Sequence, residues 1–150
     1  MHLNGVGYLF GRVVRNDCAR AGITNPRPWP RQPGFYLVYI YKDISDSIER
    51  IPPLKRSRLL FPPEMIGGYG WKLGYFVPVR RDTLSRDDVF PVHCFYNDVV
   101  QLVGKPPVTY LDEYGNWLDK RSEPCARWGS GEYGSIETAV AKALGLPHPE

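Results

Sequence analysis

Few side chains in this sequence have the types and spacing that catalysis or metal binding requires. The chain holds three histidines, and only His93 lies away from its ends. Histidine-based zinc sites use spacings such as H-x-x-x-H or H-E-x-x-H, and neither occurs here. A G-x-S-x-G elbow, a P-loop and a dinucleotide-binding fingerprint are also missing from the sequence. Residue chemistry therefore favours a non-catalytic protein with no metal and no cofactor.

The adjacent pair His93-Cys94 has the residue types of a thiol nucleophile and its base. The run VFPVHCFY, Val89 to Tyr96, predicts a strand, and neighbouring strand residues point to opposite faces. The two side chains then cannot readily share a proton, so we interpret Cys94 as structural. Together with Cys18 and Cys125 it makes only three widely spaced cysteines, without a C-x-x-C motif. This count predicts a reduced, cytoplasmic protein rather than a disulfide framework or a zinc knuckle.

Acidic side chains occur in two adjacent pairs, Asp87-Asp88 and Asp112-Glu113. The first pair lies in a charged loop, and the second opens a hairpin turn. Adjacent carboxylates on a turn or a strand diverge, which makes them a poor acid–base pair. A solvated or partner-facing role is the usual one for such residues.

Charge is unevenly distributed along the sequence. Residues 1–81 carry 13 Lys and Arg against 5 Asp and Glu, whereas residues 82–150 carry 6 against 11. This asymmetry indicates either a charged partner or pairing between the two halves. The densest basic cluster, Lys55, Arg56 and Arg58, could grip phosphates, but it holds only three charges.

The elements that position these groups are organised around residues 59–79, LLFPPEMIGGYGWKLGYFVPV. Pro62-Pro63 ends the first apolar triplet, because neither proline has an N–H. Three glycines at positions 67, 68 and 70 then allow a tight corner or the close approach of a neighbour. The aromatic run after them predicts a strand at Trp71–Val79.

Two earlier stretches also predict strands, at Tyr8–Arg15 and Phe35–Lys42. Gly11 inside the first indicates a bulge or a close neighbour. The second is apolar on both faces, which predicts a central position between the first strand and Trp71–Val79. Asn16 to Pro33, with four prolines, predicts a loop.

The second half predicts shorter elements and one helix. Val99 to Val103 extends or follows the strand at 89–96, and Asp112 to Asn116 predicts a hairpin turn with glycine. Glu123 to Gly134 is expected to be loop-like. The final helix, residues 135–144, should be capped by Ser135 and ended by Gly145.

These elements predict one domain over residues 1–150, of class α+β and mainly β. We expect an antiparallel or mixed twisted sheet with the C-terminal helix packed on one face. No apolar run approaches the roughly 20 residues of a membrane span, so no membrane association is expected. The first residues also lack the basic and apolar regions of a signal peptide.

The order GYLFGRVVR, FYLVYIYK, IPPL…LLFPPEMI and GWKLGYFVPV resembles the immunity protein 26 family of bacterial polymorphic-toxin and contact-dependent inhibition systems. The resemblance covers residues 5–80. Its most specific parts are Gly11-Arg12-Val13, Tyr39-Ile40-Tyr41, Leu60–Pro63, and Trp71 with Gly74-Tyr75-Phe76. These are mostly structural residues, so the resemblance describes the fold better than a site.

By this resemblance, the protein would be a cytoplasmic antidote that binds and neutralises the C-terminal domain of a cognate toxin, often a nuclease. The same family includes a small phosphotriesterase, which supplies an enzyme alternative. Hydrolysis of that kind normally needs a metal-activated water, and this chain is poor in ligands for one. A third reading is a nucleic-acid-binding module, although the acidic second half would repel phosphate.

A nuclease cleft is basic because it approaches a polyanion, so an inhibitor gains association rate and specificity from carboxylates. The acidic second half therefore predicts an interface within residues 82–133. Aromatic side chains near the acidic pairs could supply anchors. The predicted partner-binding residues are Asp87, Asp88, Asp112, Glu113, Tyr114 and Trp117.

Overall fold

A computed structural model describes residues 1–3, 5–18, 35–98 and 108–147 of the chain. Most of the predicted loop Asn16–Pro33, and all of Val99–Val103, lie outside the described residues. The class is α+β and mainly β, as predicted, with two mixed sheets and one long helix. The elements are β1 (His2–Leu3), β2 (Gly7–Arg15), β3 (Tyr36–Ser45), η1 (Arg56–Arg58), β4 (Glu64–Ile66), α1 (Tyr69–Lys72), β5 (Cys94–Asn97), β6 (Thr109–Leu111), β7 (Trp117–Leu118), β8 (Cys125–Arg127), β9 (Ser130–Gly131) and α2 (Tyr133–Leu144).

Strand β3 is the centre of the first sheet, whose order is β1-β2-β3-β4-β9. All neighbours in this sheet are antiparallel except β4 and β9, which are parallel. Side chains of β3 alternate between two apolar layers, because successive strand residues point to opposite faces. Val38 packs toward α2, whereas Leu37 and Tyr39 pack toward the second sheet. The predicted central strand is confirmed.

Strand β2 pairs with β3 along most of its length, which confirms the first predicted strand. The register shifts between Leu9 and Gly11, so a bulge lies where the glycine indicated one. A Cβ at Gly11 would lie 2.7 Å from Cδ1 of Ile40 on the neighbouring strand. A larger residue at this position would therefore displace the Ile40 side chain.

The prediction of a strand at Trp71–Val79 is wrong, because β4 occupies the place beside β3 instead. The chain forms the short helix α1 and then turns back at Gly74, whose φ of +80° favours glycine. The N–H of Phe76 donates to the carbonyl of Gly70 at 3.1 Å, and the Phe76 ring packs edge-on against Trp71. The aromatic side chains thus pack locally and do not extend the sheet.

A second sheet, with the order β7-β6-β5-β8, replaces the single sheet that the sequence predicted. Its strand β5 covers only the end of the predicted Val89–Tyr96 strand. The predicted hairpin is confirmed between β6 and β7, with Gly115 at a φ of +83°. Glu123–Gly134 is not a loop, because β8 and β9 form in it by parallel pairing with β5 and β4.

Helix α2 packs on one face of the first sheet, as predicted. Ile136 and Val140 are buried against Leu9, Val38 and Ile66. The helix begins at Tyr133, so the prediction that Ser135 caps it is wrong; Glu132 occupies the N-cap position without a side-chain hydrogen bond. Gly145 ends it in the left-handed conformation, as expected.

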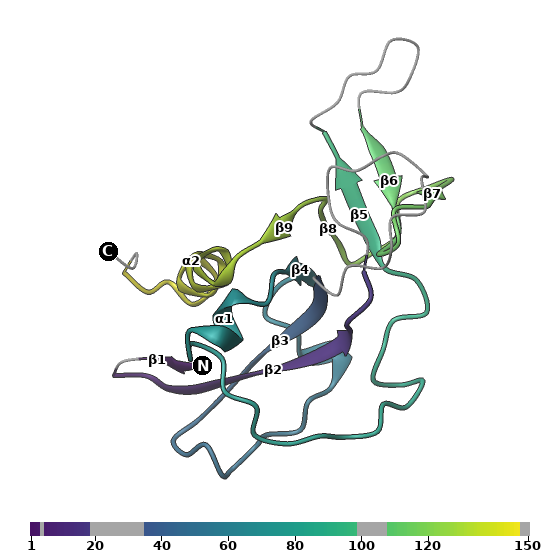
Figure 1. The fold of residues 1–150 in the computed structure, drawn as a ribbon. Helices are drawn as coiled ribbons and strands as arrows, with labels where there is room; N and C mark the ends of the chain where they lie inside the picture. Colours follow the sequence, from purple (N-terminus) through teal and green to yellow (C-terminus); the bar gives the residue numbers. More distant parts are fainter. Residues whose placement is uncertain (4, 19–34, 99–107, 148–150) are drawn as a thin grey trace.

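One apolar core joins the two sheets. Leu37, Tyr39 and Met65 of the first sheet pack in the same cluster as Phe95 and Ala126 of the second. Figure 1 shows α2 on one side of β4 and the second sheet on the other, with β8 and β9 leading from one to the other. The first sheet therefore separates two distinct apolar layers.

Candidate functional site

Exposed apolar side chains concentrate on residues 69–79. Of the thirteen large exposed hydrophobic side chains among the described residues, five come from this segment. Scattered exposed hydrophobic residues are ordinary, but a concentration on one short segment marks a candidate interaction site. The five are Tyr69, Leu73, Tyr75, Val77 and Val79.

Local packing holds this segment in place. A Cβ at Gly70 would lie 2.4 Å from the Phe76 ring, so the glycine lets that ring lie directly on α1. The Tyr75 ring stacks on Tyr133 at the start of α2, with centroids 4.2 Å apart and planes 8° apart. Tyr75 is nevertheless 51% exposed, so part of the ring remains open to a partner.

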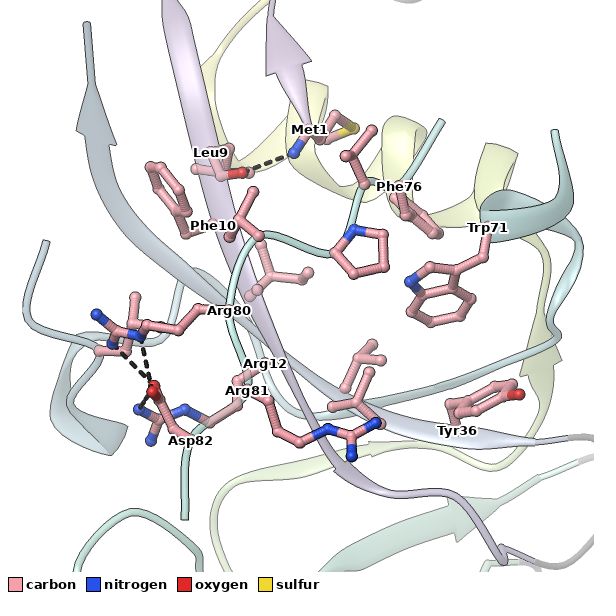
Figure 2. Close-up of a pocket in the computed structure, with 18 of the residues that line it drawn as sticks. Met1, Leu9, Phe10, Arg12, Tyr36, Trp71, Phe76, Arg80, Arg81 and Asp82 are labelled. Carbon is pink, nitrogen blue, oxygen red and sulfur yellow. Dashed lines mark hydrogen bonds and ion pairs between the residues drawn. The ribbon is translucent and has the colours of Figure 1, made fainter. Parts of the chain in front are cut away.

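Beneath the end of this segment lies a cavity of about 770 Å³. Its floor is the α2-facing side of β2 and β3, and residues 76–82, the covering segment, form the opposite wall. Figure 2 shows Trp71, Phe76 and Tyr36 on one side of the cavity. Three arginines and Asp82 gather on the other side, and the cavity therefore has an apolar part and a basic part.

A chain of polar groups is buried on the other side of the first sheet. The Tyr39 hydroxyl lies 2.7 Å from Nε2 of His93, and Nδ1 of His93 lies 3.0 Å from Oε1 of Glu113. The Tyr39 hydroxyl also accepts the Phe90 N–H at 3.0 Å. A single imidazole proton on Nδ1 satisfies every group, because Tyr39 can then donate to Nε2. The side chain of His93 is buried, so this arrangement belongs to the core.

Glu113 is a predicted partner-binding residue whose side chain is buried in the structure. It is 6% exposed, so its carboxylate cannot be presented on a surface. Burial raises its pKa, but the hydrogen bond from His93, a backbone hydrogen bond and the charge of Arg15, 3.5 Å away, together outweigh burial and leave the pKa below its ordinary value. The carboxylate serves an internal ion pair.

The other three acidic candidates differ in their exposure and in their internal hydrogen bonds. Asp87 is exposed. Asp88 pairs with Arg12 at 2.9 Å and accepts hydrogen bonds from the N–H and hydroxyl of Ser85, which lower its pKa to about 2. Asp112 accepts the N–H groups of Tyr114 and Asn116 within the hairpin turn. Two of these three carboxylates therefore hold local structure.

The aromatic candidates Tyr114 and Trp117 lie on the β6–β7 hairpin and are 42% and 54% exposed. The structure thus brings them near each other in the hairpin, together with Asp112. Their partner-binding role stays a prediction.

Ion pairs connect the basic and acidic halves of the chain. Arg12 reaches Asp82 as well as Asp88, and Arg15 reaches Glu113. Two of the three residues of the basic cluster also make internal contacts: Arg56 donates to the carbonyl of Val89, and Arg58 pairs with Asp43. The structure therefore contains the intramolecular pairing that the charge asymmetry left open. The groups that pair across the two halves are Arg12, Arg15, Arg80, Asp82, Asp88 and Glu113.

The cysteines differ from the prediction of a reduced protein without disulfides. Cys94 and Cys125 are opposite each other on the parallel strands β5 and β8, with Cα atoms 4.6 Å apart, and form a disulfide. Cys18 is free and buried, and burial raises the pKa of its thiol to about 12. The pairing of Cys94 with Cys125 could not be predicted from the sequence, because the register of their strands depends on tertiary structure.

Two further findings concern the described part of the chain. It contains no group of three or more His, Cys, Asp or Glu placed to hold a metal ion. None of its helices is long and apolar enough to cross a bilayer. Comparisons with models of protein families, with curated proteins and with solved structures find no match for this chain.

Sequence reasoning missed both the 69–79 segment as a surface and the cavity under it. The aromatic run there predicts a strand, whereas the chain forms α1 and then leaves the sheet. Gly74 and the proline at position 78 were the available signals that the segment leaves the sheet, since both favour turns and irregular structure.

Proposed function

We propose that this protein is an immunity protein, which binds the toxin domain of a polymorphic-toxin system and neutralises it by protein–protein contact. The observation that carries the proposal is the exposed apolar surface of residues 69–79. Interface centres are enriched in aromatic side chains and depleted of charge, and Tyr69 and Tyr75 lie in such a setting. The sequence resemblance to the immunity protein 26 family points in the same direction.

In this proposal the main toxin contact is residues 69–79 and not the acidic pairs. Glu113 is buried, and Asp88 and Asp112 are held by internal hydrogen bonds. Tyr114 and Trp117 remain exposed and form a second candidate surface. Single substitutions on the two surfaces should therefore affect toxin affinity differently, depending on which surface forms the interface.

A cytoplasmic location, where such an antidote would meet its toxin, is part of the proposal. The Cys94–Cys125 disulfide is more typical of an oxidising compartment. Fractionation of the producing cell, with separate assay of the periplasm and cytoplasm, tests this point directly.

The binding test uses the C-terminal domain encoded by the gene immediately upstream, produced as a catalytically inactive variant. We expect a 1:1 complex, and co-expression of this protein should protect cells against the active domain. Leu73→Ser and Tyr75→Ala should each weaken the complex by about tenfold or more, as interface anchors do. Each side chain is more than half exposed, so folding should persist.

Further variants serve as controls and distinguish residues 69–79 from the β6–β7 hairpin as the interface. Ile48→Ser and Val92→Ser change exposed apolar residues outside the segment and should leave affinity within about twofold. Loss of binding in Trp117→Ala, with Leu73→Ser and Tyr75→Ala unaffected, would instead place the interface on the hairpin. Absence of both complex formation and protection would overturn the proposed function.

A further inference from the structure

The cavity beside the covering segment has the size and lining of a small-molecule site. Its volume of about 770 Å³ lies within the range of about 300–1,000 Å³ that such sites occupy. Leu9, Val13 and Ile40 contribute to its floor, and Ile136 of α2 closes one side. Trp71 lines another side, and the covering segment adds Phe76, Val77 and Val79, so most of the lining suits an apolar ligand body.

The basic part of the cavity carries one guanidinium, that of Arg81, that no described residue neutralises. Arg12 is shared between Asp82 and Asp88, and Arg80 pairs with Asp82 at 2.7 Å. Arg81 has no ion pair or hydrogen bond with any described residue, and in Figure 2 it extends away from Asp82. An arginine guanidinium is suited to bind a carboxylate, sulfate or phosphate oxygen through two parallel hydrogen bonds.

We infer that this cavity binds a small amphipathic anion, with an apolar chain or ring between the sheet and the covering segment and a single anionic head at Arg81. The side-chain charges of the lining support one negative group. Arg12, Arg80 and Arg81 outnumber Asp82 within the lining, and Asp88 pairs with Arg12 from outside it, which leaves one positive side chain. The Met1 ammonium also lines the cavity and donates to the Leu9 carbonyl at 2.8 Å.

The geometry favours a small molecule over a folded partner. The covering segment and the sheet line the cavity from opposite sides, so the space between them admits a chain or a ring and not a protein surface. The proposed toxin contact, in comparison, uses the outward side chains of residues 69–79. Val77 and Val79 belong to both, and the test below therefore uses residues outside that segment.

The test is calorimetric titration of the purified protein with decanoate, kept below its micelle-forming concentration, and with the neutral alcohol decanol. We expect saturable 1:1 binding of decanoate and at least about tenfold weaker binding of decanol. Arg81→Gln removes the unpaired charge and should weaken decanoate binding by about tenfold, as expected for a hydrogen bond to a charged group. It should leave decanol binding unchanged.

A second variant tests the position of the apolar body. Val13 lines the cavity and is 41% exposed, so Val13→Trp can fill the space without overpacking the core; it should abolish decanoate binding. Arg86→Gln removes an exposed arginine outside the lining and serves as the matched charge control. Unfolding curves establish that each variant is folded.

The inference would be overturned if the protein did not bind decanoate, or if it bound decanoate and decanol with equal affinity. It would also be overturned if Arg81→Gln and Arg86→Gln weakened decanoate binding equally. Decanoate binding at full affinity by both Arg81→Gln and folded Val13→Trp would overturn it as well. None of these results depends on toxin binding, so this inference and the proposed function fail separately.

Discussion

At the scale of single residues, two buried tyrosines of β3 differ in their hydrogen bonds. Tyr39 and Tyr41 are both fully buried on the face toward the second sheet. The Tyr39 hydroxyl bonds to His93 and accepts the Phe90 N–H. The Tyr41 hydroxyl faces Arg12 but makes no hydrogen bond of good geometry with the described residues. The same substitution at the two positions should therefore have different effects.

We expect Tyr39→Phe to lower the free energy of unfolding by about 1–3 kcal/mol, because it leaves buried polar groups of His93 and Phe90 unpaired. Tyr41→Phe should change it by less than about 0.5 kcal/mol or raise it, since no bond is lost. Urea denaturation of both variants measures the difference. Equal losses would show that the polar chain through His93 does not stabilise the core.

Glu64 on β4 should make stability depend on pH. Burial raises its pKa from 4.5 to about 7. In the unfolded chain the carboxyl loses its proton near pH 4.5, whereas in the folded protein it keeps the proton until about pH 7. The folded state binds more protons in this window, so the free energy of unfolding falls as pH rises from 4.5 to 7.

The expected fall is of order 1–3 kcal/mol. Glu64→Gln cannot ionise, so this variant should lack that part of the pH dependence and gain stability relative to the parent as pH rises. Denaturation of both proteins at pH 4.5, 6 and 7.5 checks this. A constant difference between them across the series would mean that Glu64 ionises normally in the folded protein.

At the scale of elements, α1 and the chain after it depend on close packing at one glycine. A Cβ at Gly70 would lie 2.4 Å from the Phe76 ring, whereas a Cβ at Gly68 would lie 3.5 Å from the Tyr36 ring. Gly70→Ala should therefore cost about 1–3 kcal/mol by overpacking. Gly68→Ala meets only ordinary contact and should be nearly neutral. Thermal unfolding of the two variants provides the comparison, and similar melting temperatures would contradict the packing at Phe76.

The link between β5 and β8 can be tested by counting thiols. In the unfolded, unreduced protein we expect one reactive thiol, that of Cys18, because Cys94 and Cys125 are paired. Reduction before unfolding should raise the count to three. Titration with a thiol reagent in denaturant measures both values. Three thiols without reduction would show that the protein is produced as a dithiol, as the cysteine count alone predicted.

Elements that depend on local sequence pattern could be predicted, and elements that depend on distant partners could not. The run of β3 that is apolar on both faces, the glycine of the β6–β7 turn and Gly145 after α2 are local signals, and each predicts its element correctly. Strands β8 and β9 have two or three residues each and exist only through parallel pairing with β5 and β4. Nothing in their own composition distinguishes them from a loop.

The same distinction applies to the candidate sites. The exposure of Tyr114 and Trp117 follows from a recognisable hairpin, so it could be anticipated. The burial of Glu113 could not, because its partners His93 and Arg15 lie far from it in the chain. The cavity also required the structure, since its walls come from β2, β3, α2 and the covering segment together.

At the scale of the whole molecule, ion pairs between the basic and acidic halves determine what charge is left for a partner. Charge reversal at Asp87, Asp88, Asp112 and Glu113 together would be the direct test of the predicted acidic interface, but three of these carboxylates make internal bonds. Such a variant would lose stability and binding at once. A single substitution at the hub of the pairing is therefore a cleaner test.

Arg12 is that hub, because it leaves β2 to reach Asp82 and Asp88 on the acidic side and its side chain is only 15% exposed. We expect Arg12→Gln to lower the melting temperature, since it breaks both pairs and leaves two carboxylates without their cation. Arg86→Gln, at an exposed position, should change the free energy of unfolding by less than about 0.5 kcal/mol. Added salt should narrow the gap between the parent protein and Arg12→Gln, because it screens partly exposed pairs. Equal melting temperatures for the two variants at low salt would mean that the halves are held together by the shared apolar core alone.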